Sequence, residues 1–156
     1  MKKPKALLFV CTGNTCRSPM AEALWNAWDD VPRAQSAGVS AWSGQPAAPY
    51  AQEAVAALGG DLSRHRSRDL SEITEEPDLI LTMTRAQAER VQQLKPQWQQ
   101  KTFVLSEFVG SQGDIPDPIG GDRDMYRAVA ENIRAHLFAL KARLQTHDRH
   151  QMQPEE

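Results

Sequence analysis

Short apolar runs of strand length alternate along the chain with longer segments of helical periodicity, and this alternation limits the possible folds most. Ala6–Cys11 is a continuous apolar run, as expected for a strand that is covered on both faces. Further strands are predicted at Arg33–Ala37, Asp78–Met83 and Lys101–Leu105. Strands that alternate with helices form parallel sheets with right-handed crossovers. The pattern therefore predicts a single-domain, three-layer α/β fold, an open parallel sheet of about four strands with helices on both faces.

Four helices are predicted between and after these strands. A Ser-Pro pair, which is typical of a helix start, opens a helix over Pro19–Trp28 with Ser18 as its N-cap. Two more are predicted over Ala47–Leu58, which ends at a Gly-Gly pair, and over Arg85–Leu94. The last helix, over Asp122–Gln145, is long and amphipathic. Its apolar face is predicted to consist of Met125, Val129, Ile133, Leu137, Leu140 and Leu144.

The length and composition fit one globular domain. The chain has 156 residues, of which 40% are hydrophobic and 24% charged. We predict a folded body over residues 1–146 and a polar, flexible C-terminal tail over residues 147–156. No apolar run approaches the roughly 18–20 residues of a membrane span, and no signal peptide is recognisable, so we expect a cytoplasmic protein. The formal net charge of −2 provides no general field to attract nucleic acid, which we do not expect as a partner.

The chain has two cysteines, Cys11 and Cys16, and they lie close together in the sequence. This count excludes a disulfide scaffold and a zinc site built mainly from thiolates. Three of the histidines, His136, His147 and His150, lie on the last predicted helix or in the tail, without other metal-binding residues at a suitable spacing. We therefore expect no metal site.

Residues 11–18 read Cys-Thr-Gly-Asn-Thr-Cys-Arg-Ser and lie between the first strand and the first helix. Ligands of open parallel sheets bind at the carboxyl ends of the strands. A loop of this length can surround a tetrahedral oxyanion with its backbone N–H groups, and the positive end of the helix dipole adds to the attraction. Gly13 permits backbone angles that a side chain would forbid, and Asn14 is one of the few residue types that tolerate the left-handed region. The predicted anion-binding loop consists of Thr12, Gly13, Asn14, Thr15, Cys16, Arg17 and Ser18.

Cys11 and Arg17 supply reactive groups to this loop. A cysteine at a helix start beside an arginine is stabilised as a thiolate, which is a nucleophile. The planar, two-pronged guanidinium of Arg17 matches two equatorial oxygens of a phosphoryl group in transfer. The alternative is a cysteine packed as a small apolar residue beside a solvated arginine. The strand-to-helix junction, with Gly and Asn in the loop, favours the catalytic interpretation.

The segment Leu-Phe-Val-Cys-Thr-Gly-Asn-Thr-Cys-Arg-Ser-Pro-Met-Ala-Glu resembles the signature of the low-molecular-weight protein tyrosine phosphatase family. The resemblance continues to about residue 145. It implies a flavodoxin-like fold and a cysteine-dependent phosphatase that forms a phosphocysteine intermediate and needs no metal or other cofactor. The other matching segments are Ser36-Ala37-Gly38, His65–Arg68, Leu79–Met83, and Asp117-Pro118 followed by Gly120-Gly121.

The general acid is assigned through this resemblance. On the residues alone, an Asp-Pro pair in a loop rich in glycine and proline is more typical of a turn. The resemblance implies instead that Asp117 protonates the leaving group and later activates water, with Pro118 holding it in an extended conformation. Asp114 and Asp122 are the nearby alternatives, and both have the pattern of solvated loop carboxylates.

The family resemblance also implies a group of side chains that hydrogen-bond together and hold the loop in shape. These are Asn14, Ser18, Ser36 and His65. Cys16 has two interpretations. It is either a small buried residue, or the partner of Cys11 in a reversible disulfide that protects the nucleophile from further oxidation.

Three positions bear on the substrate. Thr15 stands where tyrosine-directed members usually carry an apolar residue such as Ile, and the whole loop motif is similar to that of the bacterial protein arginine phosphatases. A hydroxyl there can hydrogen-bond a guanidinium or the attacking water. Ile119 departs from the aromatic residue expected after Asp-Pro in both groups. Trp42 is either an aromatic residue at the rim of the site or a partly buried packing residue.

We therefore predict a monomeric enzyme that acts on phosphorylated proteins and hydrolyses phosphoarginine. The alternative is a phosphatase of the same family that acts on phosphotyrosine. Thioredoxin-coupled arsenate reductases share the fold, but they need further cysteines, and none follows Cys16 in this chain.

Overall fold

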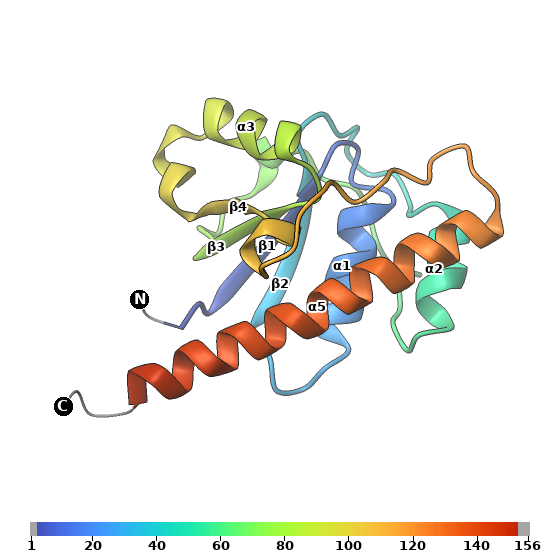
Figure 1. Ribbon diagram of the computed structural model, residues 1–156. Coiled ribbons are helices and arrows are strands. Elements are labelled where there is room, and N and C mark those ends of the chain that lie inside the picture. The colour runs from blue at the N-terminus through green and yellow to red at the C-terminus, as the bar shows by residue number, and fades with distance from the viewer. Residues whose placement is uncertain (1–2, 153–156) are drawn as a thin grey trace.

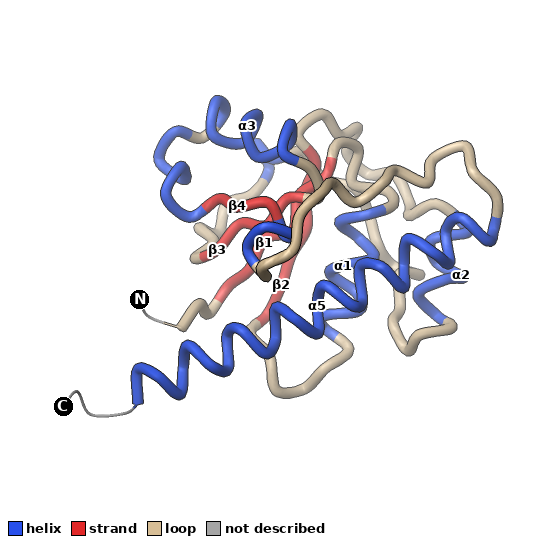
Figure 2. The backbone as a smooth tube through the Cα atoms, in the orientation of Figure 1, coloured by secondary structure: helices blue, strands red, loops and turns tan. Residues whose placement is uncertain are grey.

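The computed structural model describes residues 3–152 and contains one sheet of four strands (Figures 1 and 2). The strands are β1 (Ala6–Cys11), β2 (Arg33–Gly38), β3 (Leu79–Thr82) and β4 (Thr102–Val104). They lie in the order β2-β1-β3-β4, and each pair is parallel. This arrangement confirms the predicted open parallel α/β sheet.

The helices are α1 (Arg17–Asn26), α2 (Pro49–Ala56), η1 (Leu70–Glu72), α3 (Arg85–Leu94), η2 (Pro96–Lys101), α4 (Leu105–Phe108) and α5 (Arg123–Met152), where η marks a 3-10 helix. The four predicted helices occur in the predicted order as α1, α2, α3 and α5, of which only α3 has the predicted bounds, and three short helices that were not predicted occur as well. The fourth strand ends at Val104, before the predicted Leu105, because the chain turns there into the short helix α4.

The start of α1 differs from the prediction. Arg17 is the first helical residue and Cys16 is the N-cap, so Ser18 lies inside the first turn. The prediction that Ser18 is the N-cap is therefore wrong. Its hydroxyl contacts Asn14 and Cys11 instead, because the anion-binding loop folds back over the first turn of the helix.

α5 also differs from its prediction. It continues to Met152, seven residues beyond the predicted end, because no glycine or proline interrupts residues 146–152. Six residues of the predicted tail are thus helical, and residues 153–156 lie outside the described part of the chain. Met125, predicted on the apolar face, is 50% exposed, while its neighbour Tyr126 is buried. The face that meets the core in this first turn begins one residue later than predicted.

β1 is covered on both faces, as its continuous apolar run predicts. Successive side chains of a strand point to opposite faces. Leu7 and Phe9 therefore join the core with α1, α2 and α5, while Leu8 and Val10 join a second core that includes Val91 of α3. Figure 1 shows α3 on one side of the sheet and α1, α2 and α5 on the other. The burial of each such side chain contributes about 1.5–3 kcal/mol, and together they fix the end of β1, where the site lies. Within residues 3–152, no helix is both long and apolar enough to cross a membrane.

Candidate active site

Three loops lie at the carboxyl ends of β1 and β3: the loop after β1, the loop after β3 and the loop of residues 110–121. The chain leaves β1 toward α1 on one face of the sheet and leaves β3 toward α3 on the other (Figure 1). Open parallel sheets bind ligands where two such loops diverge. The loop of residues 110–121 returns to the same edge, because the Ile115 N–H donates to the Met83 carbonyl at 2.9 Å. Residues far apart in the sequence therefore surround the end of β1.

Cys11 is the last residue of β1 and is 3% exposed. Its Sγ lies 2.9 Å from the Ser18 hydroxyl oxygen and accepts the Asn14 backbone N–H at 3.3 Å. The Ser18 hydroxyl is free to rotate, so it can donate to a thiolate. Two donors thus converge on the sulfur at the start of α1, where the helix dipole also favours negative charge.

Asn14 gives the loop its shape. It has a φ of 57°, and among residues 3–152 it is the one residue other than glycine with a positive φ. Its Nδ2 donates to the Ser18 and Ser36 hydroxyls at 2.9 Å each, and its carbonyl oxygen lies 2.8 Å from His65 Nε2. The structure therefore brings together all four residues that the family resemblance implied. The left-handed conformation costs of order 1–3 kcal/mol, and these hydrogen bonds hold Asn14 in it.

The structure does not use the backbone freedom of Gly13 for a left-handed turn. Gly13 lies outside the left-handed region, and a Cβ added there would meet only the Thr15 Oγ1, at an ordinary 3.9 Å. The left-handed residue of the loop is the next one, Asn14. Gly38 at the end of β2 has the tighter place, since a Cβ there would lie 2.4 Å from the Thr12 carbonyl oxygen.

Three further residues support the loop, and the sequence reasoning missed them. Glu22 Oε1 accepts the Ser36 hydroxyl at 2.5 Å, and the Arg68 N–H donates to Asn14 Oδ1 at 2.9 Å. Gln87 Nε2 donates to Thr12 Oγ1 at 3.1 Å. Gln87 had a signal in the sequence, because it follows Thr84 by three residues in the pattern of a capping box. Glu22 and Arg68 lay inside the family segments but carried no signal of their own.

Arg17 and Asp117 meet beside the loop. The guanidinium of Arg17 is 6% exposed and donates through Nη1 to the Ile115 carbonyl at 3.0 Å. Its Nη2 lies 3.5 Å from Asp117 Oδ2, and the Asp117 side chain is 42% exposed. Water screens a pair that is open on one side, so this ion pair contributes little to stability. It does place a carboxyl group at the mouth of the loop.

The two alternatives to Asp117 cap helices. Asp114 Oδ1 accepts the backbone N–H of Arg85 at the start of α3, and Asp122 Oδ1 accepts that of Met125 at the start of α5, each at 2.9 Å. These bonds satisfy N–H groups that have no partner within a helix. Among the described residues, neither Asp114 nor Asp122 forms a hydrogen bond or ion pair with Cys11 or Arg17, so the geometry favours Asp117.

Cys16 is buried under the loop. It is 5% exposed, and its Sγ lies 3.6 Å from the Tyr126 hydroxyl. Burial raises the pKa of the Cys16 thiol, and the contact with Tyr126 opposes this in part. Burial likewise raises the pKa of Tyr126, which packs edge-on against Tyr50 with ring centroids 5.7 Å apart. Both cysteines are present as free thiols.

The segment of residues 39–48 runs along the loop and is bonded to it at both ends. The Val39 N–H donates to the Cys11 carbonyl at 3.0 Å and the Ala48 N–H to the Thr15 carbonyl at 2.9 Å. Trp42 in this segment is 83% exposed, so the interpretation of it as a packing residue is wrong. Ile119 in the loop of Asp117 is 68% exposed.

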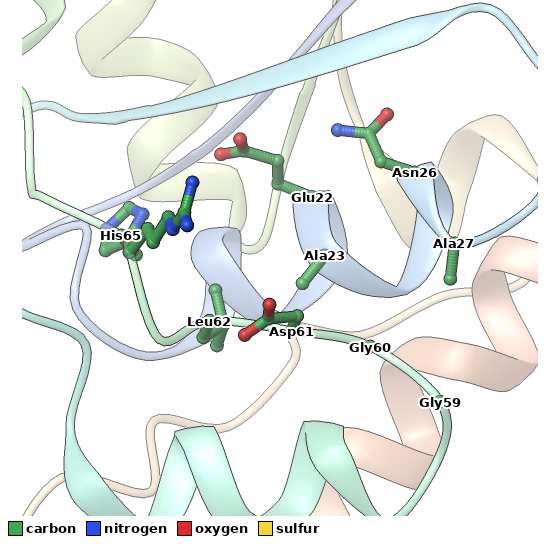
Figure 3. Close-up of a pocket in the computed structure, with 10 residues that line it drawn as sticks. Glu22, Ala23, Asn26, Ala27, Gly59, Gly60, Asp61, Leu62 and His65 are labelled. Carbon is green, nitrogen blue, oxygen red and sulfur yellow. The ribbon is translucent and has the colours of Figure 1, made fainter.

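A separate groove of about 440 Å³ lies beside α1, on the side of the supporting residues (Figure 3). Glu22 lines the groove from α1, and His65 lines it from the segment that faces this helix. Both residues also contact the hydrogen-bonded group around Asn14. The lining of the groove includes no residue of the anion-binding loop. The groove is therefore distinct from the site around Cys11. The other lining residues are Ala23, Asn26, Ala27, Gly59, Gly60, Asp61, Leu62 and Arg64.

Among the side chains described by the structure, no group of three or more His, Cys, Asp or Glu residues is placed to hold a metal ion. His136 is exposed on α5, and its Nδ1 lies 2.8 Å from the carbonyl oxygen of Asn132. The side chains of His147 and His150 lie outside the described part of the structure.

A nucleophile, a loop of N–H donors, an arginine and a carboxyl group are the parts that a cysteine-based phosphatase requires. The family model "Low molecular weight phosphotyrosine protein phosphatase" matches residues 6–150. The chain therefore belongs to the low-molecular-weight protein tyrosine phosphatase family.

The similar proteins include both arginine phosphatases and tyrosine phosphatases. A protein-arginine-phosphatase of Geobacillus stearothermophilus is 37% identical over 145 residues, covering 92% of this chain and 98% of the relative. A probable low molecular weight protein-tyrosine-phosphatase, EpsP, of Ralstonia nicotianae is 38% identical and covers 90% of this chain and 96% of the relative. A solved structure of a mutant YwlE arginine phosphatase with a phosphorylated active-site serine has a TM-score of 0.83 at 37% identity, covering 90% of this chain and 95% of that one.

Proposed function

We propose that this protein hydrolyses phosphoarginine in proteins through a phosphocysteine intermediate on Cys11. The observation that carries the proposal is the hydroxyl of Thr15, inside the loop where an apolar side chain would form a wall suited to a phenyl ring. Among the described residues, this hydroxyl makes only a long contact, 3.8 Å to Cys16 Sγ. It is therefore available to the nitrogen atoms of a guanidinium. The named arginine phosphatases among the relatives support the same substrate class.

In the first step, the Cys11 thiolate attacks the phosphorus of the substrate. The S–P bond forms, the P–N bond breaks, and the departing guanidine nitrogen takes its proton from Asp117. The Arg17 guanidinium and the loop N–H groups bind the equatorial oxygens, whose charge they stabilise in the transition state. Arg17 Nη2 lies 3.5 Å from Asp117 Oδ2, a contact that keeps the carboxyl group beside the leaving group.

In the second step, Asp117, now a carboxylate, accepts a proton from water. The oxygen of that water attacks the phosphocysteine, the S–P bond breaks, and inorganic phosphate leaves. Cys11 returns to its thiolate form, which the Ser18 hydroxyl and the Asn14 N–H stabilise. Asp117 is protonated again and ready for the next cycle, so one carboxyl group serves as acid and then as base.

The deciding experiment compares kcat/KM on matched phosphoarginine and phosphotyrosine peptides. We expect the wild-type protein to prefer phosphoarginine, Thr15→Ile to reverse the preference, and Thr15→Ser to keep it because the hydroxyl remains. A wild-type preference for phosphotyrosine would contradict the proposal.

A second candidate function is the hydrolysis of phosphotyrosine, which the exposure of Trp42 favours. An aromatic side chain that is 83% exposed, on a segment bonded to the loop, can stack on a phenyl ring. If this function operates, Trp42→Ala lowers kcat/KM for phosphotyrosine peptides and leaves that for phosphoarginine peptides unchanged. Equal losses on both peptides would assign Trp42 to general substrate binding.

We further propose that the protein works in the cytoplasm as a monomer on phosphorylated proteins, without metal or nucleic acid. Two free thiols and a near-neutral charge support this setting. Light scattering after gel filtration should give a mass near 17.4 kDa. A chelator should leave kcat unchanged. A doubled mass or a loss of activity with the chelator would contradict the respective part.

A further inference from the structure

Gln87 is a buried polar residue that bridges α3 and the anion-binding loop. It is 4% exposed. Its Oε1 accepts the backbone N–H groups of Met83 and Thr84 at 3.0 Å each, and its Nε2 donates to Thr12 Oγ1 at 3.1 Å. The contact joins residues 75 positions apart in the sequence. The two ends of the amide therefore tie the end of β3 to the loop that follows β1.

The orientation of this amide follows from its partners. Two backbone N–H groups point at one of its terminal atoms, and a backbone N–H can only donate, so that atom must be the oxygen. The amide nitrogen then faces Thr12. The Thr12 hydroxyl oxygen accepts from Gln87, so its own proton is left for a different acceptor.

Thr12 is held in place on three sides. Its carbonyl oxygen accepts the Ser40 N–H at 3.0 Å and lies so close to Gly38 that a Cβ there would be 2.4 Å away. Gln87 fixes its hydroxyl. Thr12 directly follows Cys11, and its side chain is exposed. Its hydroxyl oxygen is therefore held in a fixed position next to Cys11 in the sequence, with its proton free for another acceptor.

We propose that Gln87 is a positioning residue that makes the Thr12 hydroxyl a hydrogen-bond donor to the phosphorylated substrate. This inference rests on the proposed function in one respect, that the loop binds a phosphoryl group, and it holds for either substrate class. The loops after β1 and β3 lead to helices on opposite faces of the sheet, and the Gln87–Thr12 bond joins α3 to the loop after β1. It couples the start of α3 to the binding of the anion.

The test is the affinity for inorganic phosphate, measured by calorimetry so that it does not depend on turnover. Thr12→Val removes the hydroxyl, and we expect it to weaken phosphate binding by about 3- to 10-fold, the effect of one hydrogen bond. Thr12→Ser should restore wild-type affinity. Gln87→Glu keeps an acceptor for Met83 and Thr84, but its carboxylate can only accept from Thr12. It thereby turns the hydroxyl proton away from the substrate, and we expect a loss of similar size.

A double-mutant cycle separates positioning from simple charge repulsion. Because the effect of Gln87→Glu acts through the Thr12 hydroxyl, adding it to Thr12→Val should cause no further loss of affinity. Gln93→Glu is the matched control, since it places the same charge on an exposed position of the same helix, and it should keep wild-type affinity.

Two results would overturn the inference. One is wild-type affinity in Thr12→Val, and the other is an equal loss from Gln87→Glu with and without the Thr12 hydroxyl. If Gln87→Glu does not fold, Gln87→Met takes its place in the cycle. No binding of phosphate by the wild-type protein would instead contradict the proposed function, so the two failures are distinguishable.

Discussion

Asn14 shows how much of the site depends on single side chains. Its backbone adopts a conformation that most residues avoid, and its side chain reaches Ser18 in α1, Ser36 in β2 and the N–H of Arg68. Each bond comes from a different segment. The N–H of the same residue points at Cys11 Sγ. The backbone turn and the hydrogen bond to the nucleophile are therefore fixed by one residue.

Asp117 is the residue whose chemical role is most easily isolated. Asp117→Asn keeps the size and removes the exchangeable proton, so we expect kcat to fall by about 100- to 10,000-fold with little change in KM. With p-nitrophenyl phosphate, whose leaving group needs less protonation, the phosphocysteine should accumulate and be detectable by mass spectrometry.

Asp114→Asn is the matched control for this prediction, because an amide oxygen can still accept the Arg85 N–H and cap α3. It should retain kcat within about twofold, because a retained cap changes stability by a kcal/mol at most. A comparable loss of kcat in both variants would contradict the assignment of Asp117.

Cys16 leads to a prediction about oxidation and pH. Peroxide converts the Cys11 thiolate to a sulfenic acid with release of hydroxide, and attack by Cys16 would then form the Cys11–Cys16 disulfide and release water. Because burial raises the pKa of Cys16, its thiolate becomes available only at more alkaline pH than for an ordinary cysteine. The ratio of disulfide to sulfinic Cys11 in peroxide-treated protein should therefore rise with pH. Sulfinic Cys11 without any Cys11–Cys16 link, seen by mass spectrometry, would contradict the disulfide.

At the scale of elements, the site depends on the close approach of the end of β2 to the loop. Gly38 pairs with Cys11 across the sheet, and its N–H donates to the Arg68 carbonyl at 2.9 Å. The absence of a side chain lets the Thr12 carbonyl lie against it. β2 thus acts as a support for the loop, in addition to its part in the sheet.

Gly38→Ala should separate these two elements. The added Cβ would lie 2.4 Å from a backbone oxygen and 2.9 Å from Ala41 Cβ, so the backbone must shift. We expect the free energy of unfolding to fall by about 1–3 kcal/mol and phosphate binding to weaken. Urea unfolding and calorimetry measure the two effects.

Gly110→Ala is the control for Gly38→Ala. It lies at a φ of 85° with no atom within 4 Å of an added Cβ, so its cost is the conformational strain of about 1 kcal/mol alone. It should leave phosphate affinity unchanged. Equal effects of both variants on phosphate affinity would contradict the support role of Gly38.

The elements also show where sequence reasoning succeeded. The apolar run of β1 and the capping residue Thr84 before α3 are local signals, and both elements were predicted at the observed bounds. The predicted start of α1 was wrong because serine is a common N-cap residue, whereas the Ser18 hydroxyl in this fold accepts a hydrogen bond from the Asn14 side chain. The end of α5 was misplaced because polar residues can continue a helix when no breaker follows.

At the scale of the whole molecule, α5 joins the site to the largest core. Tyr126 contacts Cys16 near its start, and the buried residues Leu137, Leu140 and Leu144 cover the sheet further along. Leu144 is the last residue for which the structure describes burial in this core. The folded body proposed for residues 1–146 includes all of these contacts.

Truncation of the chain tests where the folded body ends. A chain that ends at residue 146 should keep its kcat and its melting temperature. A chain that ends at Ala139 loses Leu140 and Leu144, whose burial is worth about 3–6 kcal/mol together, a large part of the stability of a domain. We expect it to melt well below the full chain in differential scanning calorimetry. A large fall in melting temperature for the longer truncation would show that residues 147–156 belong to the folded body.

The four strands, the four longest helices and the loop of residues 11–18, with the nucleophile proposed in it, could be predicted from the amino-acid sequence alone. Those features depend on residue types within one turn of helix or a few strand positions, where local sterics and periodicity are sufficient. The tertiary structure decided which distant groups meet the loop. Arg17 bonds to Ile115 across 98 positions, and Gln87 reaches Thr12 across 75. Such contacts have no local signal, because they arise only when parallel strands bring their carboxyl ends, and the loops that follow them, to the same edge of the sheet.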